Sequence, residues 1–325
     1  MKKSNELMGY AGTLGALVIL CVIFTVASPN FLKLNNIMII LGQAPFYAML
    51  ASGMLFCLIT AGIDLSVGAN ATFCGCVCGM LVQRGISNPI LLIVVALACG
   101  TLIGLVNGTL LTRLHLPHPF VSTLGMKNVL WGLALLVTGS QMVSFSGVAD
   151  GFLWLGQANI AGIPVSFILV VVIYIIMHIL LTKTALGRSI YCAGGNMEAT
   201  RLSGINAANV LTFCYALSGF MAALAGIVNV GRATICNGSN AVQPYDTDAI
   251  ACCIIGGASF NGGKGTMLGT MLGALIITTL RNGFTLLALS SAIQNMVLGL
   301  VIIGAVLLDV TRERMEAKAR RMATK

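Results

Sequence analysis

The chain has little charge, and acidic charge is the scarcest. Of its 325 residues, nine are Asp or Glu and 18 are Lys or Arg, so that charged residues make up 8%, against roughly 25% in soluble domains. Apolar residues make up 58%, and the mean hydropathy is +0.97. A soluble fold cannot hide so much apolar surface, whereas a bilayer accepts helices of about 20 apolar residues. The apolar runs are continuous rather than alternating, which argues against a β-barrel and predicts an all-α polytopic membrane protein.

Motifs that carry enzyme chemistry are absent. The chain has no G-x-S-x-G elbow, no HExxH and no acid pair suited to hydrolysis. The stretch ASFNGGKGT (258–266) resembles a phosphate loop, but Ala258 replaces its first glycine and Gly265 stands where Ser or Thr would bind Mg²⁺. Most of the 11 cysteines lie in apolar runs without histidines or carboxylates nearby, as small packing residues do. We therefore expect no catalytic residue, no metal and no cofactor.

The net charge of +9 comes from basic residues at the ends of apolar runs and in the tail 312–325. This distribution is typical of topology signals and lipid-headgroup contacts rather than of a nucleic-acid surface. The sequence predicts a transmembrane domain over 1–310 and a basic cytoplasmic tail over 311–325.

About ten apolar segments follow one another, and the eighth and ninth are short and interrupted by glycine. They are 8–27, 37–60, 65–82, 89–112, 119–138, 163–182, 208–230, 249–262, 266–282 and 292–309. With the N-terminus in the cytoplasm, alternation leaves only Lys33, Arg84, Arg232 and Arg281 outside and places the other 14 basic residues inside. Lys127 is a weak marker because it lies partway into a span. The bias predicts that both termini are cytoplasmic.

A short pattern occurs twice. Residues 100–108 read GTLIGLVNG and residues 265–273 read GTMLGTMLG. They fall in the fourth and ninth spans, and an odd offset of five spans inverts one copy relative to the other, as in transporters built from opposed halves. Small-xxx-small patterns also recur by chance in glycine-rich membrane proteins. We predict an inverted internal repeat, with chance recurrence as the alternative.

Asp64, in AGIDLSVG (61–68), is the only acid that the apolar pattern places near the membrane interior; the other acids are expected in loops or at span ends. A carboxylate at that depth costs about 2.5–3.5 kcal/mol on insertion scales. It could line a pathway, or it could cap the following helix, and the two roles are compatible. The candidates for the pathway or its gate are Asp64, Ser66, Asn107, Asn128 and Asp248. No chain of buried acids and histidines is visible, which argues against proton coupling and leaves sodium coupling open.

The polar segment 183–207 stands between two long apolar spans. Asn196 can cap a helix over Met197–Ser203 that Gly204 closes, and Glu198 can pair with Arg201 at i,i+3. About 25 residues are more than two neighbouring spans need for a connection. This predicts a cytoplasmic docking element for a soluble partner, the alternative being an ordinary surface loop.

Five stretches together resemble the permease subunits of bacterial ABC importers of the ribose/galactose/arabinose/xylose type. They are SPNFLKLNNIMIIL (28–41), AGIDLSVGA (61–69), VNGTLLTRLHLPHPFVSTLGM (106–126), TALGRSIYCAGGNMEATRLSGI (184–205) and YDTDAIACCIIGGASFNGGKGTMLGTMLGALI (245–276). The chain departs from the family pattern at Ala61 (usually Gly), Thr200 (usually Ala), Asp246 (usually Glu), and Cys252 and Cys253 (usually small residues).

The resemblance implies a multi-pass protein of the bacterial inner membrane that works with three kinds of partner. These are a cytoplasmic ABC ATPase with tandem cassettes, a periplasmic substrate-binding protein, and a second permease chain in a homo- or heterodimer. It places the ATPase contact on Gly195, Asn196, Glu198, Arg201, Leu202, Ser203 and Gly204. ATP hydrolysis is then expected in the partner chain, and this chain forms the passage for a monosaccharide. The alternatives are an ABC permease for nucleosides or branched-chain amino acids, or an ion-coupled secondary transporter.

Overall fold

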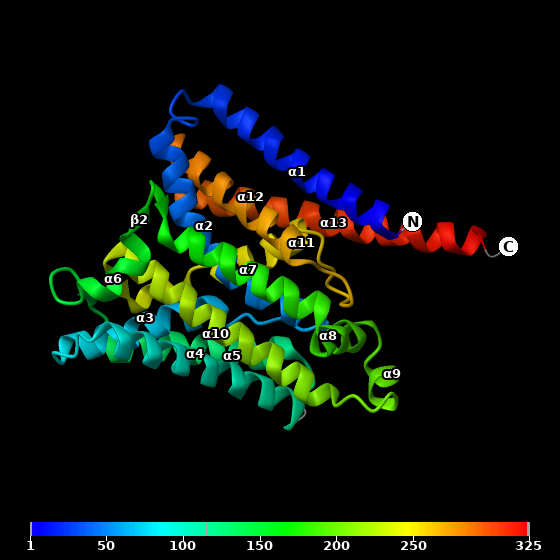
Figure 1. Cartoon of the computed structure of the whole chain (residues 1–325), viewed down its shortest axis with the longest axis horizontal. Helices are drawn as coiled ribbons and strands as arrows, with labels where there is room; N and C mark the ends of the chain where they lie inside the picture. The colour runs from blue at the N-terminus through cyan, green and yellow to red at the C-terminus, as the bar shows by residue number, and fades with distance from the viewer. Residues whose placement is uncertain (1, 115, 324–325) are drawn as a thin grey trace.

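The computed structural model describes residues 2–114 and 116–323, with side chains described for 10–114, 116–307 and 310–311. Nearly all of its regular structure is helical (Figure 1). The helices are α1 Lys2–Ala27, α2 Leu34–Ile59, α3 Val67–Gln83, α4 Pro89–Thr112, α5 Pro119–Thr138, α6 Asp150–Gln157, α7 Val165–Lys183, α8 Ala185–Gly195, α9 Met197–Leu202, α10 Ala207–Ala233, α11 Tyr245–Ile255, α12 Met267–Leu286 and α13 Ser291–Ala323, with a 3-10 turn η1 at Gly238–Val242.

Each predicted apolar segment overlaps a helix, although 249–262 runs past the end of α11 at Ile255 into a connector. Within the described residues, six helices are long and apolar enough to cross a membrane: α1 over Tyr10–Ala27, α2, α4, α5, α7 and α10. Two shorter apolar helices are α3 and the Ser291–Leu307 part of α13, while α11 has 11 residues and α12 has 20. The prediction of a helical polytopic membrane protein is therefore confirmed. α13 continues from its apolar part into the tail 311–325, most of whose side chains lie outside the described set.

Two long helices, α2 and α10, form the centre of the bundle. Two thirds of the apolar window of each is buried, against 6% for α1. α10 packs on α2, α3 and α4, and α2 also packs on α7, α11 and α12. Gly53 allows α2 to approach Ser218 of α10, where an added Cβ would lie 2.8 Å from its Cα. Small residues of this kind let helix backbones approach in membranes.

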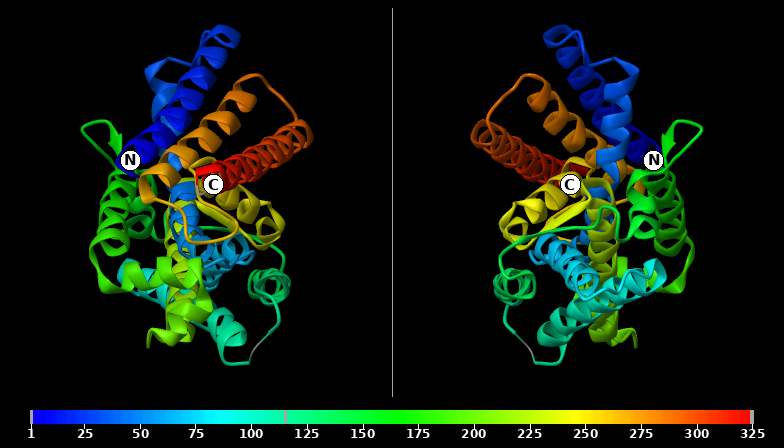
Figure 2. Two further views of the ribbon diagram at one scale, coloured as in Figure 1. Left: turned by 90° about the vertical axis from the view of Figure 1, so that its right-hand side faces the viewer. Right: turned by 90° about the vertical axis from the view of Figure 1, so that its left-hand side faces the viewer.

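The remaining helices flank this centre. α1, α12 and α13 lie on one flank, and α3, α4 and α5 lie on the other (Figures 1 and 2). Short antiparallel strands join the ends: β1 Met142–Ser144 pairs with β4 Ile235–Asn237, and β2 Asn159–Ile160 pairs with β3 Ile163–Pro164. Asn88 and Thr266 cap α4 and α12 with their side-chain oxygens, as their residue types predict.

Two short helices, α3 and α11, begin inside the bundle rather than at its surface. α2 ends at Ile59, and Ala61 then takes the left-handed conformation, with φ of 57°, so the chain runs irregularly to Val67. α10 ends similarly at Ala233, and the next residue, Thr234, has φ of 60°. The first turns of α3 and α11 meet, because a Cβ at Gly68 would lie 2.8 Å from the Cβ of Tyr245 and 3.3 Å from the backbone nitrogen of Asp246. Irregular backbone at this depth is tolerated where protein surrounds it.

Candidate functional site

The first part of the site is a cluster of polar side chains around Asp64, just before α3. One carboxylate oxygen, Oδ1, accepts hydrogen bonds from the Ser66 backbone nitrogen at 3.0 Å and from the Ser66 hydroxyl at 2.6 Å. The other oxygen, Oδ2, accepts from the Ser218 hydroxyl of α10 at 2.8 Å. The Asn107 amide of α4 donates to the Ser66 hydroxyl oxygen at 2.9 Å. Three of the predicted pathway residues, Asp64, Ser66 and Asn107, thus share one network.

All four side chains in this network are buried, and Asp64 is the one acidic residue among them. Asp64 and Ser218 are each 1% exposed, and Ser66 and Asn107 are 0% exposed. Among the described residues no Lys or Arg forms an ion pair with Asp64. The Asn107 Oδ1 atom is buried without a hydrogen-bond partner. A carboxyl group buried among hydroxyl and amide groups without a basic partner is costly to ionise, and acidic residues at such positions in membranes are typically functional.

The capping role expected of Asp64 is realised only in part. Asp64 accepts the backbone N–H of Ser66, but α3 begins at Val67 and Ser66 holds the N-cap position without a side-chain capping bond. The carboxylate therefore shapes the turn that leads into α3 rather than holding its first turn. Two carbonyl contacts on the neighbouring Ile63 fix the same turn: the Thr123 and Tyr215 hydroxyls each donate to it at 3.3 Å.

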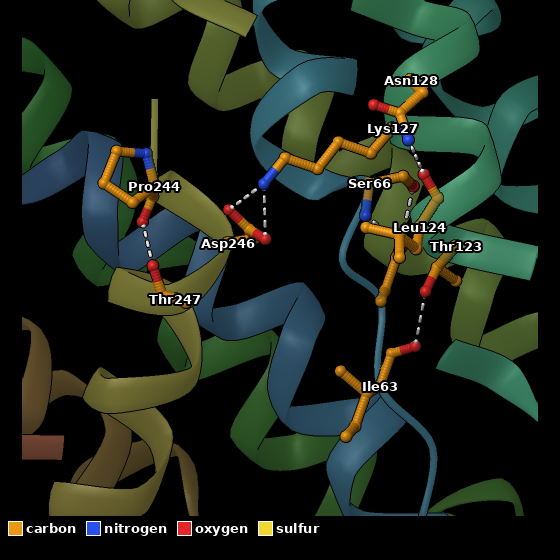
Figure 3. A network of polar contacts seen from close by, with 10 residues as sticks. Ile63, Ser66, Thr123, Leu124, Lys127, Asn128, Pro244, Asp246 and Thr247 are labelled. Atoms are coloured by element: carbon orange, nitrogen blue, oxygen red, sulfur yellow. Dashed lines mark hydrogen bonds and ion pairs between the residues drawn. The ribbon is translucent and has the colours of Figure 1, made fainter. Parts of the chain in front are cut away.

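Two buried ion pairs form the second part of the site. Lys127 Nζ of α5 lies 2.9 Å from both carboxylate oxygens of Asp246 (Figure 3). Arg281 Nη2 of α12 lies 2.8 and 2.6 Å from the oxygens of Asp248. Both acids lie in the first turn of α11, where the helix dipole favours negative charge.

These pairs correct the prediction that Asp64 is the only acid in the interior. Asp246 and Asp248 are 4% and 2% exposed, although the sequence predicted them in a loop or at the end of a span. The basic residues Lys127 and Arg281 could have indicated these buried acids, because a basic residue inside an apolar span requires an acidic partner. Lys127 is consequently a structural residue and not a topology marker.

Asn128, the remaining pathway candidate, does not join either cluster. It lies on an exposed part of α5, and its amide donates to the Leu124 carbonyl of its own helix at 3.1 Å (Figure 3). Asp248 is part of the ion pairs rather than of the Asp64 network. The structure thus separates the five candidates into a network of three, an ion-paired acid and a surface amide.

The third part of the site is the segment 183–207, which forms two helices, α8 and α9, between the end of α7 and the start of α10. The predicted cap is confirmed, because Asn196 Oδ1 accepts from the Ala199 backbone nitrogen at 2.9 Å. Gly204 closes α9 with φ of +80°, a conformation that suits glycine. Glu198 and Arg201 pair at 3.9 Å, with side chains 75% and 69% exposed, and Leu202 is 82% exposed. α9 therefore presents charged and apolar groups outward.

α8 fastens this segment to the bundle. A methyl group at Gly194 would overlap the carbonyl oxygen of Ile59 at the end of α2. The Tyr191 hydroxyl donates to the Gly265 carbonyl at 2.7 Å, and the Gly263 backbone nitrogen donates to Ile59 at 2.8 Å. The phosphate-loop-like stretch 258–266 is thus a connector between α11 and α12 that rests against α8.

The comparison with known families identifies the kind of protein. The family profile described as "Branched-chain amino acid transport system / permease component" matches residues 36–306. The chain belongs to this family of transport permeases.

Curated relatives cover nearly the whole chain. The ribose import permease of Haemophilus influenzae is 38% identical over 297 residues, covering 90% of this chain and 91% of the relative. That of Bacillus subtilis is 38% identical over 305 residues, covering 94% of each. The galactose/methyl galactoside import permease of Escherichia coli is 34% identical over 312 residues, covering 90% and 91%. No solved structure matches the chain.

Proposed function

We propose that this chain is the membrane-spanning subunit of an ATP-driven monosaccharide importer. The observation that carries the proposal is the similarity to permeases named for ribose, allose and galactose import over nine tenths or more of the chain. Sugar permeases dominate these relatives, although the family description names branched-chain amino acids. The subunit forms the passage, and the chemical work of ATP hydrolysis belongs to a separate chain.

The partners follow from this assignment. A cytoplasmic ATPase with tandem cassettes docks on α9 and its flanks, through Gly195, Asn196, Glu198, Arg201, Leu202, Ser203 and Gly204. A periplasmic binding protein delivers the sugar at the opposite end, and a second permease chain completes the passage. The exposed charges and the exposed Leu202 side chain of α9 support the docking role, since an apolar group left in water favours burial in a partner.

Movement of α9 has a defined route into the bundle. α8 is packed on the end of α2 and on the connector 258–266, which follows α11. A displacement of α8 therefore moves α2 and α11. The first turn of α11 contains Asp246 and Asp248 and contacts the start of α3. In this mechanism ATP binding and hydrolysis shift the docked helices, and the meeting point of α3 and α11 opens alternately to the two sides.

The full architecture that we propose is ten spans in two inverted halves, α1–α5 and α7–α13. Helix packing supports the repeat: α2 packs on α11 and α12, and its counterpart α10 packs on α3 and α4. Each half also contains a short helix, α3 in the first and α11 in the second, that begins in the interior close to an acidic residue. The glycine patterns do not occupy equivalent contacts, because Gly100 and Gly104 pack on α10 whereas Gly269 and Gly273 pack on α11.

The orientation that we propose places both termini in the cytoplasm of a bacterial cell, with the chain in the inner membrane. Without Lys127, 13 of the remaining 17 basic residues still fall on the cytoplasmic side of the predicted alternation. Segment 183–207 is then cytoplasmic, as docking of the ATPase requires.

Reconstitution tests the proposed function. The chain is placed in proteoliposomes with its ATPase and binding protein, and uptake of radiolabelled ribose, galactose and allose is measured with and without ATP. We expect uptake that needs all three components. Uptake by the permease alone under a sodium or proton gradient would instead show a secondary transporter.

A further inference from the structure

A cavity of about 210 Å³ lies away from the Asp64 network, between α2, α10, α11, α12 and α13. The nine lining residues are Gln43, Phe46, Tyr47, Asn229, Arg232, Tyr245, Arg281, Thr285 and Gln294. α10 is 27 residues long, or about 40 Å at 1.5 Å per residue. Segment 183–207 leads into its first residues, and Asn229 and Arg232 lie at its other end. The cavity therefore lies at the end of the bundle opposite the ATPase-docking segment, where a delivered solute would arrive.

Much of the polar lining has no partner within the protein. In the described part of the chain, the side chains of Gln43, Asn229 and Arg232 make no hydrogen bond and no ion pair. Arg281 Nε is buried without a hydrogen-bond partner, although Nη2 of the same side chain binds Asp248. Polar groups facing a cavity without partners require water or a polar ligand.

Aromatic rings supply the remaining wall. Phe46 lies edge-to-face with Tyr47 at 5.3 Å and with Tyr245 at 4.9 Å between ring centroids. The Arg281 guanidinium lies 5.8 Å from the centre of the Tyr47 ring. The arginine and the two ring contacts fix the orientation of this wall, so that the cavity is preformed.

The lining selects against two of the alternative solutes. It contains no aliphatic side chain, so nothing in it matches the branched hydrocarbon of a Leu or Val substrate. Its volume of about 210 Å³ lies below the roughly 300–1,000 Å³ of sites for drug-sized ligands, which is small for a base joined to a sugar. Amide groups offer both donors and acceptors, as the hydroxyl groups of a sugar require.

We propose that this cavity is a binding site for one neutral monosaccharide, held by the amides of Gln43, Asn229 and Gln294 against the aromatic wall. The inference rests on the proposed function and adds a solute site to the permease itself. The Asp248–Arg281 pair is neutral as a whole, and the exposed Arg232 side chain adds one positive charge to the lining. The site gives the sugar its first contacts in this chain after release from the binding protein.

The direct test is protection of a cysteine at the cavity rim. Thr285→Cys is combined with Cys192→Ser, which removes the exposed native cysteine, and the complex with its ATPase is placed in nanodiscs. We expect D-ribose or D-galactose to slow maleimide labelling at least threefold, and leucine, uridine and ribose 5-phosphate to leave it unchanged. Leu287→Cys is the matched control, since this residue is exposed near the same end of α12 but does not line the cavity. Equal labelling of the Thr285→Cys thiol with and without either sugar overturns the proposal, as does stronger protection by the phosphate ester.

Transport of variants gives the second test. Gln43→Leu and Asn229→Leu should each reduce initial sugar uptake at least tenfold in the complete complex while ATPase copurification stays normal. Asn35→Leu, an exposed amide on the same helix as Gln43, should stay within twofold of the wild type. Normal uptake in both cavity variants overturns the site but leaves the importer assignment intact. Absence of sugar uptake by the wild-type complex instead contradicts the proposed function.

Discussion

Two acid–base pairs of this chain stand in opposite surroundings. Lys127 and Asp246 meet at 2.9 Å with side chains 21% and 5% exposed, whereas Glu198 and Arg201 meet at 3.9 Å with side chains 75% and 69% exposed. Removing one partner of a buried pair costs about 3–5 kcal/mol because a charge is left unpaired. An exposed pair contributes only about 0.2–1 kcal/mol. The first pair is therefore sensitive to the loss of either partner, whereas the second can be changed at little cost to the fold.

The largest expected effect on stability comes from breaking the buried pair. Lys127→Met leaves the Asp246 carboxylate buried without its cation, and we expect a loss of about 3–5 kcal/mol in unfolding free energy. Thermal unfolding of the detergent-solubilised protein measures it. The double variant Lys127→Met/Asp246→Asn should recover most of the loss, and failure to recover would show that the lysine acts by packing and not by charge.

A smaller effect is expected where segment 183–207 joins the bundle. Gly194→Ala places a methyl group against the carbonyl of Ile59, and overpacking of this kind costs about 1–3 kcal/mol. We expect lower uptake together with retained ATPase copurification, because α8 is displaced while α9 keeps its surface. Gly132→Ala is the matched control, since the space beside Gly132 is open and this residue lies in α5, outside segment 183–207. Equal behaviour of the two variants would contradict the route from α8 into α2.

Asp64 allows a test of charge without a change of shape. In Asp64→Asn the amide oxygen can still accept from Ser66, and the Ser218 hydroxyl can rotate to accept from the new amide. We expect unfolding free energy within about 1 kcal/mol of the wild type, the scale of one hydrogen bond, but uptake reduced about tenfold. Asp150→Asn, at an exposed acid in α6, should leave uptake unchanged. Equal and mild effects of the two variants would leave Asp64 with a structural role alone.

Local patterns in the sequence predict the long helices and the short helix α9, but not the ion pairs. Apolar runs locate the spans, and Asn196 and Gly204 delimit α9, because each signal acts over a few residues. Asp246 lies 119 residues from Lys127 in sequence, and no local pattern joins them. The polar stretch 231–248 reads as a loop, although tertiary packing draws its last residues into the interior. The cavity lining likewise comes from five separate helices and has no sequence signature.

The smallest effect on stability and the largest on function should occur at α9. Arg201→Glu changes an exposed side chain and should alter unfolding free energy by no more than about 0.5 kcal/mol. Gly204→Pro forces φ near −65° where the chain takes +80°, and so disrupts the closing turn locally. Both variants should still insert into the membrane, as membrane-fraction yield would show.

The measurement that tests the central claim most directly is ATPase copurification with Arg201→Glu, joined to sugar uptake in proteoliposomes. If a separate ATPase drives this bundle through segment 183–207, the stably folded variant loses the ATPase and all ATP-dependent uptake. Normal copurification and normal uptake by that variant would contradict the account.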